Sequence, residues 1–209
     1  MKENFGLYLI LTDPVAGYET CAQAAVECRV RYLQLRIKNA PREAILKTAK
    51  TLRKITLGTE TRLIINDDLS IAMDVDADGV HLGQGDQTIT DARLHWNTPR
   101  KLFGLSTHSL EQAFQALEQA PDYIGIGPVF PTPTKVDAGP ALGTTEAGRI
   151  AKEIPLTSVA IGGINGDNLP ELIKANTQNY CVVRAVNESP TPIVAIRQLQ
   201  EIWKNAFSA

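Results

Sequence analysis

The stretch YLQLRIKNAPREAILKTAKTLRKITLGTETRLIIND (32–67) contains a strand pattern, a helix pattern and a second strand pattern in succession. The runs at 32–37 and 62–67 are short and apolar, which is typical of buried strands. Between them, the segment 41–55 spaces its apolar residues near helical intervals. Strands that alternate with helices run parallel, because each helix returns the chain to the same end of the sheet. The stretch therefore predicts one strand–helix–strand unit of a parallel α/β fold.

The same alternation extends over the rest of the chain. Further strand patterns lie at 7–13, 79–84, 102–107, 123–130, 157–164 and 179–186. Further helix patterns lie at 18–30, 109–120, 167–176 and 191–207. The connections after the third and fourth strand patterns are shorter than the others. The chain thus repeats its strand–helix unit eight times.

Eight units in 209 residues average about 26 residues each, which suits a compact (β/α)₈ barrel, also called a TIM barrel. A doubly wound open sheet is the alternative, and it requires a glycine-rich fingerprint after the first strand. The first strand here ends in LTDPVAG, and polar residues follow nearly all the strands. We therefore expect an α/β protein with one (β/α)₈ barrel domain over 1–209, closed by the helix at 191–207.

Composition narrows the possible partners and compartments. The 21 basic and 23 acidic side chains nearly balance, and no basic block is present that would neutralise a nucleic acid. The opening residues have no signal-peptide core and no apolar span of membrane length. Cys21, Cys28 and Cys181 lack metal or redox spacing and are expected to be reduced core thiols. We expect a cytoplasmic protein that binds neither nucleic acid nor membrane, and the sequence sets no oligomeric state.

Polar residues at the strand ends are expected to share the carboxyl-terminal face of the barrel, where the active sites of this fold are built. In QLRIK, the two-residue period of a strand sends Gln34, Arg36 and Lys38 to one side. That side is either the barrel mouth or an outer surface, and we favour the mouth because a barrel strand has no solvated face. Arg and Lys together suit phosphate oxygens.

Acidic residues follow the third and fourth strands. Asn66 and Asp67 end IIND, and Asp86 ends GVHLGQGD. Such residues are often turn formers or helix N-caps, and Asp67-Asp68 before LSIAM could have only this structural role. Two carboxylates from adjacent strand ends also suit Mg²⁺, which takes one or two protein carboxylates and completes its shell with water and phosphate.

The stretch VFPTPTKVDAG (129–139) carries two hydroxyls and a cation between prolines. Proline restricts its own backbone and that of the preceding residue, so Thr132 and Thr134 are expected to project in similar directions beside Lys135. This arrangement favours a clamp for a small anion.

Other strand ends offer weaker signals. Ser106 and Thr107 in GLSTH either bind phosphate or cap the next helix, and His108 is as compatible with a structural role as with catalysis. In AIGGI, Gly162 and Gly163 allow close approach of the backbone to an anion. Backbone amides near Val183 and Arg184 are further candidates, because phosphate sites in these barrels often use the last two loops.

Seven segments in this order resemble thiamine phosphate synthase, a (β/α)₈ enzyme family: YLILTD, QLRIK, IIND, ADGVHLGQGD, GLSTH, DYIGIGPVFPTPTK and AIGGI. The resemblance extends from Tyr8 to about Val186. It implies a transferase that joins an aminopyrimidine methyl diphosphate to a thiazole phosphate, or to its carboxylated form, and releases pyrophosphate. The implied partners are small-molecule substrates, and the implied cofactor is Mg²⁺.

The resemblance also implies residue roles. The pyrimidine diphosphate would be held by Gln34, Leu35, Arg36, Ile37, Lys38, Asn66, Ser106 and Lys135. Of these, Arg36, Lys38, Ser106 and Lys135 would act in catalysis, and Asp67 and Asp86 would carry Mg²⁺. The thiazole phosphate would be held by Thr132, Pro133, Thr134, Gly163, Val183 and Arg184.

The chain departs from the family pattern at its last strand, which reads NYCVVRAV, with Arg184 where a serine is usual. Arg184 either contacts the thiazole phosphate as a charge or points away and leaves only backbone amides. Two other functions compete with the synthase, namely a thiazole tautomerase and a non-catalytic phosphate-binding regulator. Neither requires the carboxylates Asp67 and Asp86 beside several cations, so we favour the synthase.

Overall fold

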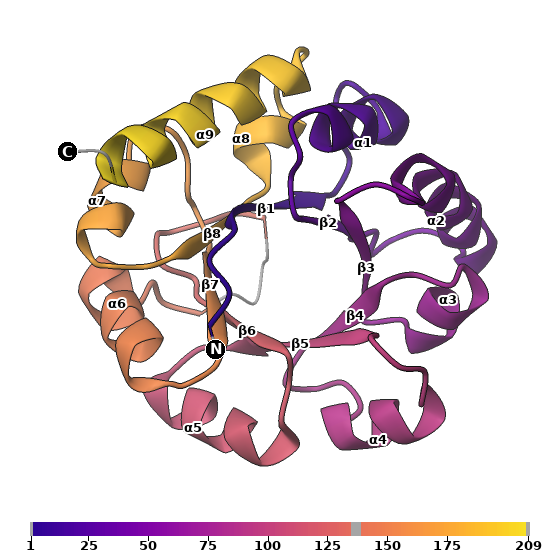
Figure 1. The fold of residues 1–209 in the computed structure, drawn as a ribbon, viewed down its shortest axis with the longest axis horizontal. Helices are drawn as coiled ribbons and strands as arrows, with labels where there is room; N and C mark the ends of the chain where they lie inside the picture. Colours follow the sequence, from indigo (N-terminus) through magenta and orange to yellow (C-terminus); the bar gives the residue numbers. More distant parts are fainter. Residues whose placement is uncertain (1, 135–138, 208–209) are drawn as a thin grey trace.

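The computed structural model of the chain describes residues 2–134 and 139–207, and its eight strands close into one parallel barrel in the order of the sequence (Figure 1). The strands are β1 (Gly6–Leu11), β2 (Tyr32–Leu35), β3 (Arg62–Asn66), β4 (Gly79–Leu82), β5 (Leu102–Thr107), β6 (Tyr123–Ile126), β7 (Thr157–Ile161) and β8 (Asn179–Val182). The expected (β/α)₈ barrel is confirmed, and the open doubly wound sheet is wrong because β1 pairs with β8.

Helices surround the barrel on its outside (Figure 1). They are α1 (Tyr18–Glu27), α2 (Arg42–Thr56), α3 (Leu69–Asp74), α4 (Ile89–His95), α5 (Leu110–Gln119), α6 (Gly143–Glu153), α7 (Leu169–Lys174), α8 (Arg184–Asn187) and α9 (Pro192–Phe207). Helix α9 packs against both α1 and α7, and so closes the outer ring as the sequence predicted.

Several strands end earlier than the apolar runs predicted. In the run at 179–186 only Asn179–Val182 is strand, and Arg184–Asn187 is a helical turn. The run at 123–130 likewise leaves the sheet after Ile126. The apolar residues beyond the strand ends still bury their side chains, as Val129 and Val186 do, so hydrophobicity continues where the strand pairing has stopped.

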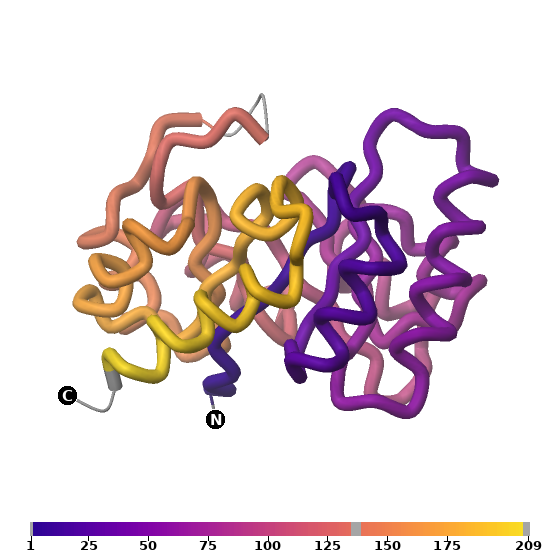
Figure 2. Tube along the Cα trace, turned by 90° about the horizontal axis from the view of Figure 1, so that it is seen from above, coloured from indigo at the N-terminus to yellow at the C-terminus, as the bar shows by residue number. Residues whose placement is uncertain are grey.

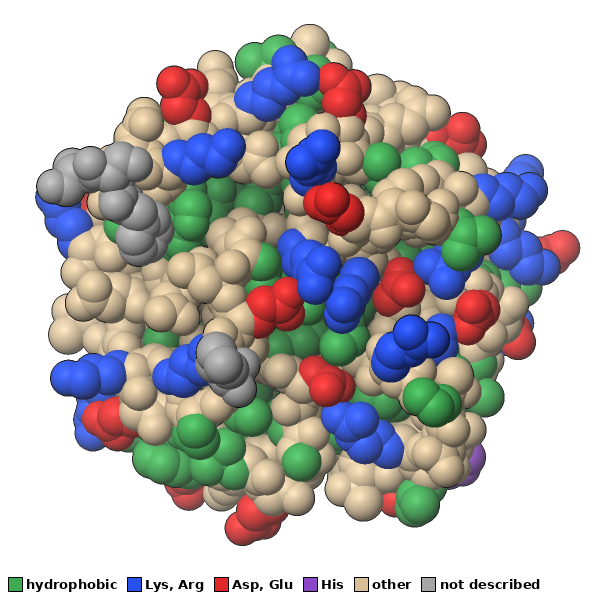
Figure 3. Space-filling view, in the orientation of Figure 1, with side chains coloured by type: hydrophobic (Ala, Val, Ile, Leu, Met, Phe, Trp, Pro, Cys, Tyr) green, Lys and Arg blue, Asp and Glu red, His purple; other side chains and the backbone are tan. Residues whose placement is uncertain are grey.

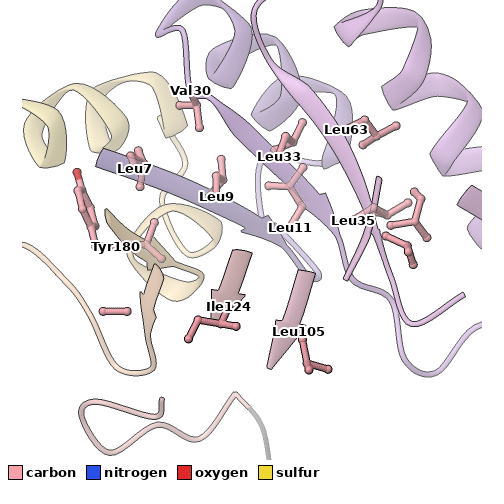
Figure 4. Packing of buried hydrophobic residues seen from close by; sticks show 14 of the residues in the cluster. Leu7, Leu9, Leu11, Val30, Leu33, Leu35, Leu63, Leu105, Ile124 and Tyr180 are labelled. Carbon is pink, nitrogen blue, oxygen red and sulfur yellow. The ribbon is translucent and has the colours of Figure 1, made fainter. Parts of the chain in front are cut away.

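The main hydrophobic core lies between the barrel and the helices. Alternate strand residues point outward into this layer, among them Leu7, Leu9 and Leu11 of β1 and Leu33 and Leu35 of β2 (Figure 4). Helix α2 covers this side with Ala49 and Leu52, which are fully buried. The same alternation forces the residues between them into the barrel.

The barrel interior is filled by a second, smaller cluster that includes Tyr8, Tyr32, Tyr123 and Ile64. Three tyrosine rings pack together here, with centroids 5.5 to 5.9 Å apart, and Tyr32 stacks on both Tyr8 and Tyr123. Gly104 makes the space for them, because a Cβ at that position would overlap the ring of Tyr123 and Nδ1 of His81. A packed interior of this kind leaves room for ligands only at the ends of the barrel.

The two ends of the barrel are built differently. The chain start and the end of α9 lie at one end, and the segment after β6 lies at the opposite one (Figure 2). At the first end Asn179 holds the N-terminal segment by accepting hydrogen bonds from the amides of Phe5 and Gly6 at 2.7 and 3.0 Å.

In the view of Figure 3, acidic and basic side chains are interspersed rather than gathered into a patch of one sign.

Candidate functional site

A cavity of about 630 Å³ opens at the carboxyl-terminal ends of the strands. Twelve of the expected substrate- and metal-binding residues line it, although they come from seven different strand ends. They are Gln34, Arg36, Lys38, Asn66, Asp67, Asp86, Ser106, Thr132, Thr134, Gly163, Val183 and Arg184. The fold therefore gathers into one place residues that are up to 150 positions apart in the chain.

Four other expected site residues do not line this cavity with described side chains. Leu35 is 1% exposed and packs in the outer core, and Ile37 packs against the same core. Pro133 is exposed on the segment between the two threonines. Lys135 lies outside the described residues, so its expected role stays a prediction.

The cationic side of the cavity comes from β2 and the residues that follow it. Gln34, Arg36 and Lys38 all line the cavity, in agreement with the two-residue period, although the strand itself ends at Leu35. Lys38 Nζ donates to Asp67 Oδ2 and forms an ion pair with it. Because the Lys38 side chain is half exposed, this pair contributes little to stability and serves mainly to place the two charges.

The carboxylates divide into one helix cap and two cavity residues. Asp68, not Asp67, is the N-cap of α3, since its Oδ1 accepts a hydrogen bond from the Ile71 amide at 2.8 Å. Asp67 adopts a left-handed backbone with φ 61° and donates its amide to the carbonyl of His81 at 2.8 Å. The capping role therefore belongs to the neighbour, and Asp67 faces the cavity.

Asp86 lies close to Asp67 and is held by the turn after β4. Its Oδ2 accepts a hydrogen bond from the Gly83 amide at 2.7 Å. Desolvation raises the pKa of the Asp86 carboxyl, and the charge of Asp67 raises it further. Within residues 2–134 and 139–207 no group of three or more His, Cys, Asp or Glu could hold a metal. The two carboxylates alone suit an ion that takes its remaining ligands from water and substrate, as Mg²⁺ does.

The end of β5 places Ser106 and Thr107 differently from the capping alternative. The N-cap of α5 is Ser109, which accepts from the Gln112 amide at 3.1 Å, so capping by Ser106 or Thr107 is wrong. Ser106 Oγ lies 2.9 Å from Nε2 of His81, and Thr107 donates to the carbonyl of Gly125.

His108 also lines the cavity, and its Nδ1 lies 2.6 Å from the carbonyl oxygen of Gly127. This contact ties the residues after β5 to the start of the segment after β6. A neutral His108 must donate from Nδ1 to that carbonyl, because a carbonyl only accepts. His108 therefore has the structural role that the sequence allowed, and it also lines the cavity.

The loops after β6 and β7 pack closely against each other. Thr132 and Thr134 both line the cavity, and Thr132 Oγ1 accepts a hydrogen bond from the Thr134 amide at 3.3 Å. Gly163 has φ 66°, and a Cβ there would lie 2.6 Å from the carbonyl oxygen of Pro131. Only glycine combines this backbone with this approach, so Gly163 brings its loop against the threonine segment.

The turn after β8 pairs the unusual arginine with an acid. Arg184 Nε donates to Glu188 Oε1 at 2.6 Å, and both side chains line the cavity. The Arg184 side chain is therefore at the cavity, but its charge is shared with Glu188. Asn187 supports this turn from below, since its Nδ2 donates to the carbonyls of Ile10 and Val183 at 2.8 and 2.7 Å.

Sequence reasoning missed His81, Glu188 and Asn187 as site components. The sequence did contain a signal for His81. In GVHL, Val80 and Leu82 point outward into the core, so the two-residue period of the strand points His81 into the barrel. Glu188 and Asn187 had no such signal, since they belong to a helical turn where a strand was expected.

The fold and the cavity together define a class of protein: a (β/α)₈ barrel whose strand ends carry a polar and charged cavity, the place where enzymes of this fold act. A family model described as thiamine monophosphate synthase matches residues 7–186 of the chain. The chain belongs to this family.

Individual relatives agree with this assignment. A thiamine-phosphate synthase from Shouchella clausii is 36% identical over 199 residues, which cover 94% of this chain and 91% of the relative. A thiamine-phosphate synthase from Pyrococcus furiosus is 34% identical and covers 97% of this chain and 96% of its own. The solved structure of a thiamine phosphate pyrophosphorylase from Pyrococcus furiosus has a TM-score of 0.84 at 33% identity, with coverage of 97% and 96%. Over the described residues, no helix is both long and apolar enough to span a membrane.

Proposed function

We propose that the protein is a thiamine-phosphate synthase. It condenses 4-amino-2-methyl-5-(diphosphooxymethyl)pyrimidine with 4-methyl-5-(2-phosphoethyl)thiazole, or the carboxylated form of the latter, and releases thiamine phosphate and pyrophosphate. The observation that carries this proposal is that one cavity combines the Asp67 and Asp86 carboxylates, the cations Arg36 and Lys38, and a separate hydroxyl-bearing segment after β6. Membership of the family supports the same reaction.

The pyrimidine diphosphate is assigned to the side of the cavity formed by β2, β3 and β5. Arg36 and Lys38 neutralise its phosphate oxygens, while Asn66 and Ser106 donate hydrogen bonds to them. Gln34 lies deeper and faces the pyrimidine. The side chains of Leu35 and Ile37 lie in or against the outer core, so their contribution is restricted to the backbone. Lys135 completes this set in the proposal.

Asp67 and Asp86 are proposed to hold Mg²⁺. The residues fit this ion, because desolvation and the charge of Asp67 both disfavour the ionised form of Asp86, and a bound cation would favour that form. When bound, Mg²⁺ stabilises negative charge on the diphosphate. Lys38, which is paired with Asp67, stands where it can hold the same diphosphate.

The thiazole phosphate is assigned to the opposite side of the cavity. Thr132, Pro133 and Thr134 approach it from the loop after β6, and Gly163 from the loop after β7. The amides of Val183 and Arg184 complete the site, with the Arg184 side chain at its edge. The two substrates then lie side by side, each held through its own phosphate.

The reaction follows from this placement. The bond between the pyrimidine methylene carbon and the diphosphate oxygen breaks first, and the bonding electron pair leaves with the diphosphate. The electron-rich aminopyrimidine stabilises the methylene cation, and the thiazole nitrogen then supplies the electron pair of the new C–N bond. The protein contributes charge stabilisation and positioning rather than a nucleophile. Cys181, the cysteine that lines the cavity, is unsuited to attack because burial raises the pKa of its thiol.

Two broader assignments accompany this function. We propose that residues 1–209 act as a single barrel domain. We also propose a cytoplasmic location, which is supported by the three cysteines, all of which are unpaired thiols as in a reducing compartment.

The proposal is tested by pyrophosphate release from the two substrates with Mg²⁺ and with chelator. Asp67→Asn is compared with Asp68→Asn, a neighbouring change that keeps the helix cap, because Asn caps helices well. Release should require both substrates, the metal and Asp67, and should survive the change at Asp68. A folded wild-type protein that binds thiazole phosphate and releases no pyrophosphate under any condition would exclude the synthase and favour the tautomerase or the regulator.

A further inference from the structure

A continuous chain of hydrogen-bonding groups runs through the barrel interior from Gln34 to Ser106. Gln34 Nε2 lies 2.9 Å from the hydroxyl of Tyr8, and that hydroxyl lies 2.9 Å from the hydroxyl of Tyr123. The Tyr123 hydroxyl lies 3.1 Å from Nδ1 of His81, whose Nε2 lies 2.9 Å from Ser106 Oγ. The five side chains come from five different strands. The two end members of this hydrogen-bond chain, Gln34 and Ser106, line the cavity.

The tyrosine part of these hydrogen-bonded groups is shielded from water, whereas His81 is half-buried and lines the cavity. Gln34 and Tyr8 are each 2% exposed, and Tyr123 is 3% exposed. Burial also raises the pKa of both tyrosine hydroxyls, so each keeps its proton. A buried hydroxyl has one hydrogen to donate, and in such a chain the direction of one bond sets the direction of the next.

The Gln34 end of the chain sets one direction. Its amide nitrogen faces Tyr8 and can only donate, so the Tyr8 hydroxyl accepts there and passes its own hydrogen to Tyr123. Tyr123 then donates to Nδ1 of His81, which leaves the proton of a neutral imidazole on Nε2. Gln34 Oε1 has no hydrogen-bond partner within the described part of the chain, and it is available to an N–H of a ligand.

The Ser106 end sets the same direction independently. The proposed ligand there is a diphosphate, whose oxygens only accept, so Ser106 must donate to it. Its oxygen is then free to accept from His81 Nε2–H, and this again requires Nδ1 to accept from Tyr123. We propose that Tyr8, Tyr123 and His81 are positioning residues that form a one-way hydrogen-bond chain, which holds Ser106 as a donor toward the leaving diphosphate. This inference deepens the proposed function and rests on it for the identity of the anion.

The first test reads the tautomer of His81 without any substrate. Long-range ¹H–¹⁵N correlation spectra of the ¹⁵N-histidine-labelled protein distinguish the two neutral tautomers and the imidazolium. The chain has three histidines, so His95→Gln and His108→Gln identify the signals of His81 by elimination. The expected result at neutral pH is the Nε2–H tautomer. The Nδ1–H tautomer or the imidazolium would overturn the proposal, whether or not the protein is a synthase.

The second test removes one link and compares it with a matched control. Tyr123→Phe breaks the hydrogen-bond chain. Tyr32→Phe also removes a hydroxyl, from a ring that stacks on Tyr123, but this hydroxyl lies outside the hydrogen-bond chain and donates to Glu3 at 2.8 Å. We expect Tyr123→Phe to lower kcat about tenfold, the effect of one hydrogen bond, with an unchanged KM for thiazole phosphate and altered His81 signals. Tyr32→Phe should change neither quantity.

The outcomes separate this inference from the proposed function. If the wild-type protein releases pyrophosphate and Tyr123→Phe has the same kcat, the inference is overturned and the proposed function stands. An equal loss in Tyr32→Phe would assign the effect to packing and would also overturn it. If Tyr123→Phe does not fold, the wild-type tautomer still decides.

Discussion

Two buried asparagines, Asn179 at the start of β8 and Asn187 in the helical turn α8 that follows it, allow the stability and the activity of the barrel to be tested separately. Asn187, at the cavity end, accepts from the Thr12 amide at 2.8 Å and donates to the carbonyls of Ile10 and Val183. Asn179, at the other end, accepts from two amides and donates to two carbonyls. The side chains are 3% and 1% exposed, so water cannot replace these bonds in an alanine variant without rearrangement.

The expected losses follow from the number of bonds. A buried hydrogen bond contributes about 1 kcal/mol, so the three side-chain bonds of Asn187 predict a loss of about 3 kcal/mol in Asn187→Ala. The four bonds of Asn179 predict a loss of about 4 kcal/mol in Asn179→Ala. Urea unfolding followed by circular dichroism measures both free energies of unfolding.

The two variants should differ in their kinetics. Asn187 holds the turn that carries Val183 and Arg184, so Asn187→Ala should raise the KM for thiazole phosphate about tenfold. Asn179→Ala should leave that KM unchanged under conditions where both variants are folded, because residues at this end of a barrel serve stability. A loss below about 1 kcal/mol in Asn187→Ala would refute the hydrogen-bond reasoning. Equal changes of KM in both variants would refute the separation of the two ends.

Three further changes are expected to have separate effects. Asp86→Asn should raise the melting temperature of the metal-free protein at neutral pH, because a carboxyl whose pKa is raised destabilises the folded state when ionised. That gain should shrink in thermal scans as the pH falls and the wild-type carboxyl becomes protonated. Gly104→Ala should lower kcat far more than Gly125→Ala in pyrophosphate-release assays. A Cβ at Gly125 meets its nearest atom at 3.6 Å, whereas one at Gly104 overlaps its neighbours. Arg184→Ser should leave the reaction type and the melting temperature nearly unchanged and alter chiefly the KM for thiazole phosphate, and a collapse of turnover at constant KM would contradict this.

The side-chain directions at the end of β2 could be predicted from the sequence. In QLRIK the period of two placed Gln34, Arg36 and Lys38 on one side, and all three line the cavity. The same period explains why Leu35 and Ile37, which alternate with them, lie in or against the outer core. Alternation is a local property of an extended backbone, so it is readable from the sequence once the fold is assumed.

The turn after β8 shows the opposite case. The run NYCVVRAV looks like a continuous strand, but the chain turns into a helix at Arg184, and this turn creates the contact with Glu188. Hydrophobicity does not distinguish a short buried strand from a buried helical turn, because both bury apolar side chains. Asn187 was therefore not recognisable as the residue that supports the turn carrying Val183 and Arg184.

The sequence by itself determined the repeating unit, the closed parallel barrel and the end of the barrel at which the polar residues gather. These features depend on periodicity and on the length of each unit, which are local quantities. The tertiary structure decided which polar groups meet: Asp67 with Lys38, Ser106 with His81, and Arg184 with Glu188. The first two contacts join different strand ends, so they depend on the register and curvature of the closed barrel. The third depends on a helical turn, whose formation is decided by packing against the neighbouring elements.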